Sequence, residues 1–425
     1  MKAKLILVAI VCLIANQTFG QTELVKELNS KIIEAKAVSP DSCLNDLNNL
    51  HNILSDKKII GLGEATHGTH EFFVYKHRMI KHLVENENFK VFIIEGDFAG
   101  SQAMNDYVVY GKGTIKDGLM GIGYGVWFKQ EFVDFIEWIK IYNDDKTLED
   151  KIKFYGCDIN NEALVAKKIK TYLNQIQELN QPLQEGLDVI IEGKLREKLS
   201  EGGTIFKEQF FSKLNNAFSS LKDEKCKEYI FMQHCKRELE QIFEFDLADG
   251  KTRIVLRDKF MAENIEWIYQ FENKQKSIFW AHNEHIKNDK EKSYQKPTGY
   301  YLKDKFGDNY YSFGFGFYEG EVAGYNREEK KYDSFEVPSM SSKKLTDAVF
   351  SLCMYPNFIL DLNSANKSEI ISKFLHTNLY QRTIGAGFYP DGKKRNHFRM
   401  GKLKDKYDGI IFIKKTHPSV LIKKM

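Results

Sequence analysis

Short apolar runs alternate with amphipathic helical segments along this chain, and that alternation limits the folds it can adopt. Each run is closed by turn or acidic residues, as a buried strand is. The predicted strands are 59–63, 91–94, 154–158, 277–281, 310–317, 358–360, 383–388 and 409–413. The predicted helices among them are 72–84, 99–110, 131–142 and 253–271. This order predicts an α/β fold, with a mostly parallel central sheet flanked by helices.

A long segment without strands interrupts this pattern. From 161 to 246 the sequence is rich in Leu, Lys, Glu and Gln and shows helical character only. We therefore predict a helical insertion at 161–250, between an N-terminal part of the core at 21–160 and a C-terminal part at 251–425. The glycine-rich segment from Gly111 to Gly125 is predicted to be a loop.

The first 20 residues have the layout of a secretory signal. Lys2 and Lys4 precede an apolar run at 5–15, and a polar stretch ends at Gly20. The run is too short to span a bilayer as a helix. We expect cleavage near Gly20 and an exported product, periplasmic or secreted, without stable membrane insertion. An uncleaved N-terminal anchor is the alternative.

Composition excludes several classes of protein. Hydrophobic residues make up 42% and charged residues 28%, the balance of a globular chain with a core. The formal net charge is +3, and two of the lysines lie in the leader, so the mature chain is nearly neutral. That charge predicts binding neither to nucleic acid nor to membranes. Five scattered cysteines remain after cleavage, and an odd set of this kind is not a disulfide framework.

Ionisable side chains follow four of the predicted strands. They are Glu64 and His67, Glu95 and Asp97, Asp158, and His282 and His285. Ligands of open α/β sheets bind at the carboxyl ends of the strands, where these residues fall. A single acid there is explained as a helix cap, and a single histidine as a structural residue. The whole set at equivalent positions predicts an active site, because acids are rarely buried unless paired.

The helix after the first strand adds a cation. Glu71, Tyr75 and Arg78 share one face by their spacing, opposite the apolar face of that helix. Arg78 either points toward the site or pairs with Glu71 in solvent, and the spacing favours the pair.

Several segments resemble the erythromycin esterase family. The most specific are Gly-Glu-Ala-Thr-His-Gly at 63–68 and Ala-His-Asn-Glu-His at 281–285. Further matching positions are Lys76-His77-Arg78, Glu95, Trp127, Trp138, Asn143, Tyr155-Gly156-Cys157-Asp158 and Arg257-Asp258. The resemblance implies an α/β core around a deep cleft, and hydrolysis of a small-molecule ester or lactone without a metal or cofactor. We accordingly predict substrate contacts from Arg78, Trp127 and Asp158.

The resemblance places the family's essential histidine at His67. A neutral imidazole takes a proton from water near neutral pH when a carboxylate fixes its tautomer, and Glu64 or Glu95 is expected to do so. The water then attacks the ester carbonyl. The candidates to stabilise the oxyanion or protonate the leaving alkoxide are His282, His285 and Arg78.

Other chemistries compete with this interpretation. No Gly-x-Ser-x-Gly elbow is present, which argues against a serine nucleophile. Cys157 follows a strand, but a buried apolar thiol explains it better than a nucleophile. The same Glu and His residues are sensible ligands for zinc or iron, although no His-Glu-x-x-His motif is present. A protein that binds haem or a hydrophobic ligand in the same cleft is a third possibility.

The substrate is less constrained than the chemistry. Macrolide-inactivating members of the family open a lactone ring, and this predicts a macrolide as one candidate. An export signal favours another ester outside the cytoplasm. Tyr124, Trp127 and Phe128 are expected either to form an apolar lid over a bulky substrate or to pack in the core.

Overall fold

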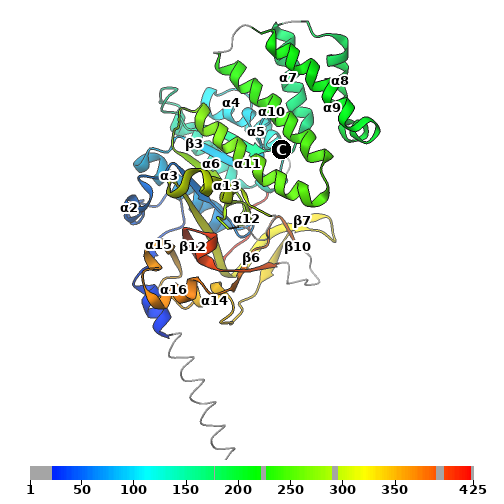
Figure 1. Ribbon diagram of the computed structural model, residues 1–425. Coiled ribbons are helices and arrows are strands. Elements are labelled where there is room, and N and C mark those ends of the chain that lie inside the picture. Colours follow the sequence, from blue (N-terminus) through cyan, green and yellow to red (C-terminus); the bar gives the residue numbers. More distant parts are fainter. Residues whose placement is uncertain (1–21, 177, 222–225, 290–294, 389–396, 423–425) are drawn as a thin grey trace, which may run out of the picture. The chain divides into compact units, whose positions relative to one another are not determined.

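The structure is a computed structural model that describes residues 22–422, except 177, 222–225, 290–294 and 389–396 (Figure 1). The predicted signal at 1–20 lies outside the described residues. The chain forms two compact units whose sequences interleave. Among the described residues, the first comprises 22–88, Ala281–Asp289 and Phe306–Leu421, and the second comprises Phe89–Trp280, 295–305 and Ile422.

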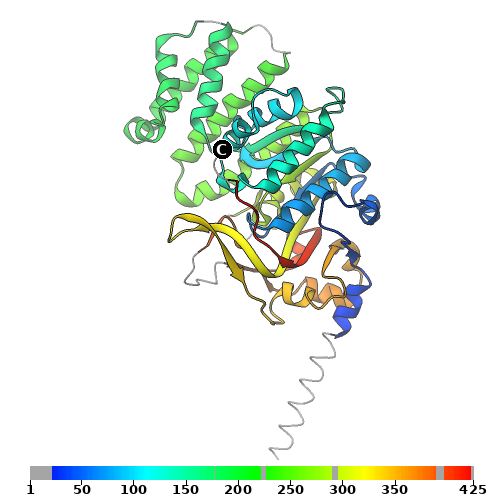
Figure 2. The same cartoon turned by 180° about the vertical axis from the view of Figure 1, so that it is seen from behind.

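The first unit is built on a mixed set of strands around the long strand β6 (Tyr310–Asn326). Its strand order is β1-β8-β12-β6-β2. Strands β12 (Gly409–Thr416) and β2 (Ile59–Leu62), which flank β6 in this order, run parallel to it. Also in this sheet are β1 (Ile33–Glu34), β7 (Lys331–Val337), β8 (Asn357–Asp361) and β10 (Gly387–Phe388). Figure 2 shows β6 and β7 as a yellow antiparallel ribbon. A separate antiparallel pair consists of β9 (Leu379–Arg382) and β11 (Phe398–Gly401).

Helix α3 (His70–Glu87) follows β2 and carries the apolar face predicted from the sequence. Phe72, Phe73 and Met79 on that face are fully buried. The helix ends at Asn88, whose left-handed backbone (φ 60°) forms the cap. The other α-helices described in this unit are residues 22–29, α2 (His51–Leu54), α12 (Asn283–Ile286), α14 (Thr346–Phe350), α15 (Leu362–Ala365), α16 (Glu369–Leu375) and α17 (Leu403–Lys406).

The second unit contains three parallel strands in the order β5-β3-β4. They are β3 (Val91–Asp97), β4 (Lys153–Asp158) and β5 (Ser277–Trp280), and every residue in them is buried. Parallel strands that are covered on both faces have continuous runs of apolar residues, and these runs made the strands predictable from the sequence. Helices α4 (Gln102–Tyr110), α6 (Gln130–Asn143) and α13 (Thr298–Phe306) also belong here.

Helices alone connect β4 to β5 among the described residues. They are α7 (Glu162–Ile176), α8 (Gln181–Ile191), α9 (Leu195–Ser219), α10 (Lys227–Leu247) and α11 (Gly250–Phe271). The first four fall within the segment predicted as an insertion. The predicted boundaries at 161 and 250 remain predictions.

The prediction of a loop at 111–125 was wrong, because this segment contains helix α5 (Ile115–Ile122). Thr114 and Asp117 form a capping box that starts the helix. Its glycines serve packing rather than flexibility. A Cβ on Gly121 would lie 2.2 Å from the carbonyl oxygen of Gly100, so only glycine permits this approach between α5 and the start of α4.

The strand predicted at 383–388 was also wrong in its extent. β9 ends at Arg382 and β10 begins at Gly387, and Gly385 between them has a φ of 71° that interrupts an extended strand. The amide of Ile384 instead donates to the carbonyl of Ala65 over 2.7 Å.

The predicted fold class is confirmed: the sheet is mixed and mostly parallel, and helices flank it. All five described cysteines are free thiols. Among the described residues, no helix combines the length and the apolar character that a bilayer crossing requires.

Candidate active site

The Gly-Glu-Ala-Thr-His-Gly segment at 63–68 joins β2 to α3 in the first unit, and backbone hydrogen bonds hold it. Gly68 accepts from the amide of Ala323 over 2.8 Å, and Glu64 accepts from the amide of Asn283 over 2.9 Å. A Cβ on Gly68 would lie 1.6 Å from the carbonyl oxygen of Ala323. A Cβ on Gly63 would lie 2.1 Å from the side-chain oxygen of Asn283. Close contact with the backbone of Ala323 therefore requires Gly68, and close contact with the side chain of Asn283 requires Gly63.

Glu64 is a fully buried carboxylate that contacts a histidine and a lysine. One oxygen, Oε1, lies 2.5 Å from Nδ1 of His67, and the other contacts the ammonium of Lys76. Burial raises the pKa of Glu64, but the charge of Lys76 and the hydrogen bond from His67 outweigh it and hold that pKa below its ordinary value of 4.5. Glu64 is therefore a buried carboxylate that stays ionised at neutral pH.

This contact determines which nitrogen of His67 carries the proton. An ionised carboxylate only accepts hydrogen bonds, so Nδ1, which faces Glu64, is the protonated nitrogen of the neutral ring. The lone pair is then on Nε2. His67 is 8% exposed, so its ring is largely shielded from bulk water. The arrangement is that of a histidine prepared to accept a proton at Nε2.

His282 has the opposite tautomer. Its Nδ1 accepts a hydrogen bond of 3.2 Å from the amide of Glu284, at the start of α12. An acceptor nitrogen carries no proton, so the neutral ring carries its proton on Nε2, which lies 3.4 Å from the hydroxyl oxygen of Thr383. The rings of His67 and His282 are 5.1 Å apart between centroids. A proton acceptor and a proton donor therefore lie side by side.

Asn283 fixes this second histidine to the sheet. Its side-chain nitrogen donates to the carbonyl of Phe315 over 2.8 Å, and its oxygen accepts from the amide of the same residue over 3.0 Å. His285 lies one turn further along α12 and is half-buried. Lys287 donates to Glu284 over 2.7 Å. Burial raises the pKa of Glu284, but the charge of Lys287 outweighs this effect and lowers that pKa to about 2.

A second cluster of charges lies in the second unit, where β3 and β4 end. Arg257 of α11 donates to Glu95 over 2.9 Å and to Asp158 over 2.6 Å. The hydroxyl of Tyr124 donates to Asp158 over 2.8 Å. Burial lowers the pKa of Arg257, but the surrounding carboxylates raise it well above its ordinary value, so the guanidinium remains charged. Two of the predicted acids are thus brought together by a cation.

Both arrangements expected for Arg78 were wrong. Its side chain is fully buried, and its guanidinium binds the carboxylate of Asp46 and the carbonyl of Cys43. Glu71 instead contacts His417 over 2.6 Å. A buried guanidinium that is held by Asp46 has a structural role, and this replaces the predicted contact with substrate.

Trp127 was expected to contact the substrate, either directly or as part of a lid. It is fully buried and donates from its indole nitrogen to the carbonyl of Glu95 over 3.0 Å. Its ring packs against Phe132 and Trp280 at 5.4 and 6.0 Å between centroids. The alternative of core packing is therefore correct for Trp127, which supports the strand end that carries Glu95.

Lys76, Arg257 and Thr383 belong to these clusters but were not in the predicted site. Lys76 gave a signal, because a lysine on the apolar face of an amphipathic helix needs a buried partner. Arg257 lies in a segment that matches the family, but its position along the chain does not indicate that it pairs with Glu95 and Asp158. Nothing in the sequence indicated Thr383, because it is distant from His282 along the chain and only the folded structure brings the two together.

The arguments from sequence against a thiol nucleophile agree with the surroundings of Cys157. Burial raises the pKa of this thiol well above its ordinary value, and Sγ donates to the carbonyl of Ile94 over 3.3 Å. Among the described residues, no group of three or more His, Cys, Asp or Glu side chains is placed to hold a metal ion.

Comparison with known proteins assigns the family. The model of the family described as erythromycin esterase matches residues 84–416, a span that includes Glu95, His282 and His285 and begins after Glu64 and His67. The erythromycin esterase type II of Escherichia coli is 24% identical over 453 residues, which cover 93% of this chain and 98% of that protein.

Solved structures agree with the fold. The crystal structure of a succinoglycan biosynthesis protein matches with a TM-score of 0.81 and 25% identity, over 95% of this chain and 99% of that one. A mutant of the erythromycin esterase EreC in its open conformation matches with a TM-score of 0.68 and 15% identity, over 92% of this chain and 99% of that one. The protein therefore has the fold of a family of hydrolases. It belongs to the erythromycin esterase family.

Proposed function

We propose that this protein hydrolyses a carboxylic ester or lactone of a small molecule, with a water molecule that His67 activates. The observation that carries the proposal is the contact between His67 and the buried, ionised Glu64. A carboxylate in this position fixes the tautomer and stabilises the imidazolium that forms when the ring takes a proton. Glu64 is therefore the orienting carboxylate, and Glu95 remains a predicted catalytic residue.

The proton transfers follow from the two tautomers. Nε2 of His67 takes a proton from water while the water oxygen bonds to the ester carbonyl carbon. His282 offers the hydrogen on Nε2 to the developing oxyanion. When the intermediate collapses, the acyl carbon–oxygen bond breaks and the proton held by His67 passes to the leaving alkoxide. The products are a carboxylic acid and an alcohol, and no acyl group is transferred to the protein.

The substrate class follows from the family and from the predicted leader. The Escherichia coli relative is named an erythromycin esterase, and this makes a macrolide lactone a candidate. The leader at 1–20 favours an ester encountered in the periplasm or outside the cell. We propose an exported enzyme whose partner is a small ester or lactone, with no nucleic acid and no stable membrane insertion.

The test is a panel of aryl esters, lactones and macrolides, measured with the wild type, His67→Ala and His67→Gln. His376→Gln is the matched control, because this exposed histidine of the same unit contacts only its own helix among the described residues. General-base catalysis contributes about 10²–10⁴-fold, so both His67 variants should lose at least a hundredfold in kcat and the control nothing. Full turnover by His67→Ala on the best substrate would show that the mechanism is wrong.

Three measurements separate the rival chemistries. Intact-mass spectra of the enzyme during turnover should show no acyl adduct, and an adduct would contradict direct attack by water. Treatment with a chelator should leave the rate unchanged. A loss restored by zinc would support a metal-dependent hydrolase, and a Soret band in the purified protein would support a haem-binding protein.

A further inference from the structure

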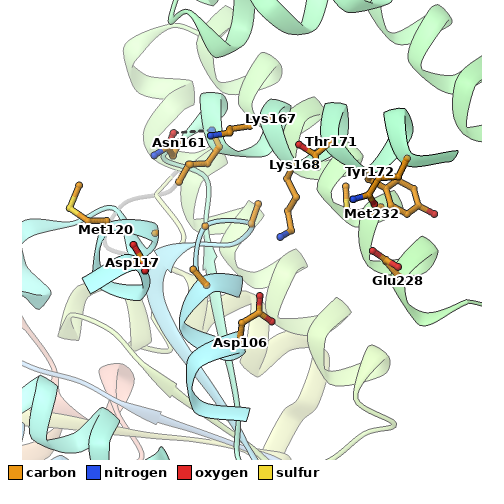
Figure 3. Close-up of a pocket in the computed structure, with 16 residues that line it drawn as sticks. Asp106, Asp117, Met120, Asn161, Lys167, Lys168, Thr171, Tyr172, Glu228 and Met232 are labelled. Carbon is orange, nitrogen blue, oxygen red and sulfur yellow. Dashed lines mark hydrogen bonds between the residues drawn. The ribbon is translucent and has the colours of Figure 1, made fainter. Parts of the chain in front are cut away.

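A cavity of about 650 Å³ lies in the second unit, where α4 and α5 face α7 and α10 (Figure 3). Its volume is within the range of small-molecule pockets. None of the residues predicted to act in catalysis lines it, and neither does Arg257. The cavity is therefore formed by residues other than those of the clusters described above.

The walls are suited to an apolar molecule. Met120, Leu164, Tyr172 and Met232 line the cavity, and methionine adapts its shape to a ligand more readily than other apolar side chains do. Met120 is 61% exposed, which leaves a large apolar side chain in contact with water at this site. A ligand with an apolar body would cover it.

The charged side chains that line the cavity differ in whether they have a bonding partner. Among the described residues, the cavity has three acids: Asp106 accepts from the side chain of Gln102 over 3.2 Å, Asp117 is held in the capping box of α5, and Glu228 is exposed on α10. Lys168 has no ion pair with any residue that the structure describes. It is half-buried, and its ammonium lies 5.9 Å from the ring centre of Phe231.

Figure 3 shows Lys168 projecting from α7 into the cavity. A half-buried ammonium beside apolar walls attracts an anion more strongly than an exposed one, because water screens it less. Lys167, its neighbour on α7, adds positive charge at the exposed rim. The three carboxylates of the lining outnumber its two lysines, so the attraction for an anion is local to Lys168. At that position the cavity suits a ligand that is apolar along its body and negative at one end.

We propose that this cavity is a binding site for an amphipathic carboxylate, with Lys168 as the residue that binds the anionic group. The apolar part lies against Met120, Met232, Leu164 and Tyr172. This proposal concerns a site that the ester hydrolysis proposed above does not use, and neither depends on the other.

The test is calorimetric titration of the purified protein with decanoate and with decanol, which share a chain and differ in charge. The variant is Lys168→Met, and the matched control is Lys170→Met on the same helix, whose lysine pairs with Asp188 outside the cavity. We expect decanoate to bind the wild type about tenfold more tightly than decanol, since a charge-assisted contact contributes about 1.5 kcal/mol. Lys168→Met should remove that preference and leave the affinity for decanol unchanged, and Lys170→Met should bind both probes as the wild type does.

Three results would overturn the proposal. The first is wild-type affinity for decanoate in Lys168→Met, and the second is a dissociation constant for decanoate weaker than about 1 mM in the wild type. The third is loss of decanoate binding in His67→Ala, which would place the ligand at the predicted catalytic histidine. Thermal melting of each variant separates loss of binding from loss of folding.

Discussion

Lys76→Met tests how the protein keeps a buried carboxylate ionised. Lys76 and Glu64 are both 0% exposed, and the ammonium lies 5.7 and 5.5 Å from the ring centres of Phe73 and Phe315. Methionine fills a similar volume without the charge. The variant therefore leaves Glu64 buried, and the contact with His67 is then the main interaction that lowers its pKa.

The cost of this change depends on pH. Removing one partner of a buried ion pair costs about 3–5 kcal/mol. In the wild type the pKa of Glu64 is lowered, so its contribution to stability is complete above pH 4.5 and is lost as the pH falls through the folded-state pKa. In Lys76→Met we expect burial, the largest influence on this carboxyl, to raise its pKa because the ammonium that opposes it is gone. The penalty should therefore grow as the pH rises above 4.5, because the variant resists ionisation of Glu64.

Urea unfolding at pH 5 and pH 8, with kcat measured at both, is the assay. We expect a larger loss of stability at pH 8 and a loss of turnover at both. Glu64→Gln combined with Lys76→Met should recover most of the stability, because a neutral pair avoids the isolated charge. It should not recover turnover, because an amide does not stabilise the imidazolium of His67. Wild-type stability and kcat in Lys76→Met at both pH values would refute the reasoning.

Three other substitutions test separate parts of the structure. Arg257→Met leaves Glu95 and Asp158 without their shared cation and should cost about 3 kcal/mol in urea unfolding, whereas an unchanged midpoint would mean that the pairing is not stabilising. Cys157→Ala should keep kcat within about twofold, since its thiol is protonated at neutral pH, and a hundredfold loss would restore the thiol as a nucleophile. Gly68→Ala forces a Cβ onto a carbonyl oxygen 1.6 Å away and should lower the melting temperature, with Gly202→Ala, where a Cβ meets open space, as the control that should not.

The sequence predicts the strands of this fold better than its connections. Buried parallel strands such as β3 and β4 are continuous apolar runs, so composition alone locates them. Helix α5 escaped prediction because Gly118 and Gly121, which usually weaken helices, are needed where it packs against α4. The segment 383–385 is apolar enough for a strand, but its bonds to the loop that carries His67 override that local preference.

The sequence predicts those residues of the candidate site that combine a reactive side chain with a position just after a strand. Glu64, His67 and His282 follow strands, and strand ends are where α/β proteins place reactive groups. Partners supplied by distant segments were not predictable, because spacing along the chain does not report contacts across it. Asp46, which holds Arg78, is such a partner, and so is Thr383 beside His282.

Activation of water by His67 is tested most directly by chemical rescue of His67→Ala. The best substrate of the ester panel is assayed with this variant over a series of imidazole concentrations, with the wild type in parallel. Without imidazole the variant should turn over at least about a hundredfold more slowly than the wild type, and added imidazole should restore part of the rate by replacing the missing base. Wild-type turnover by His67→Ala without imidazole would contradict the account.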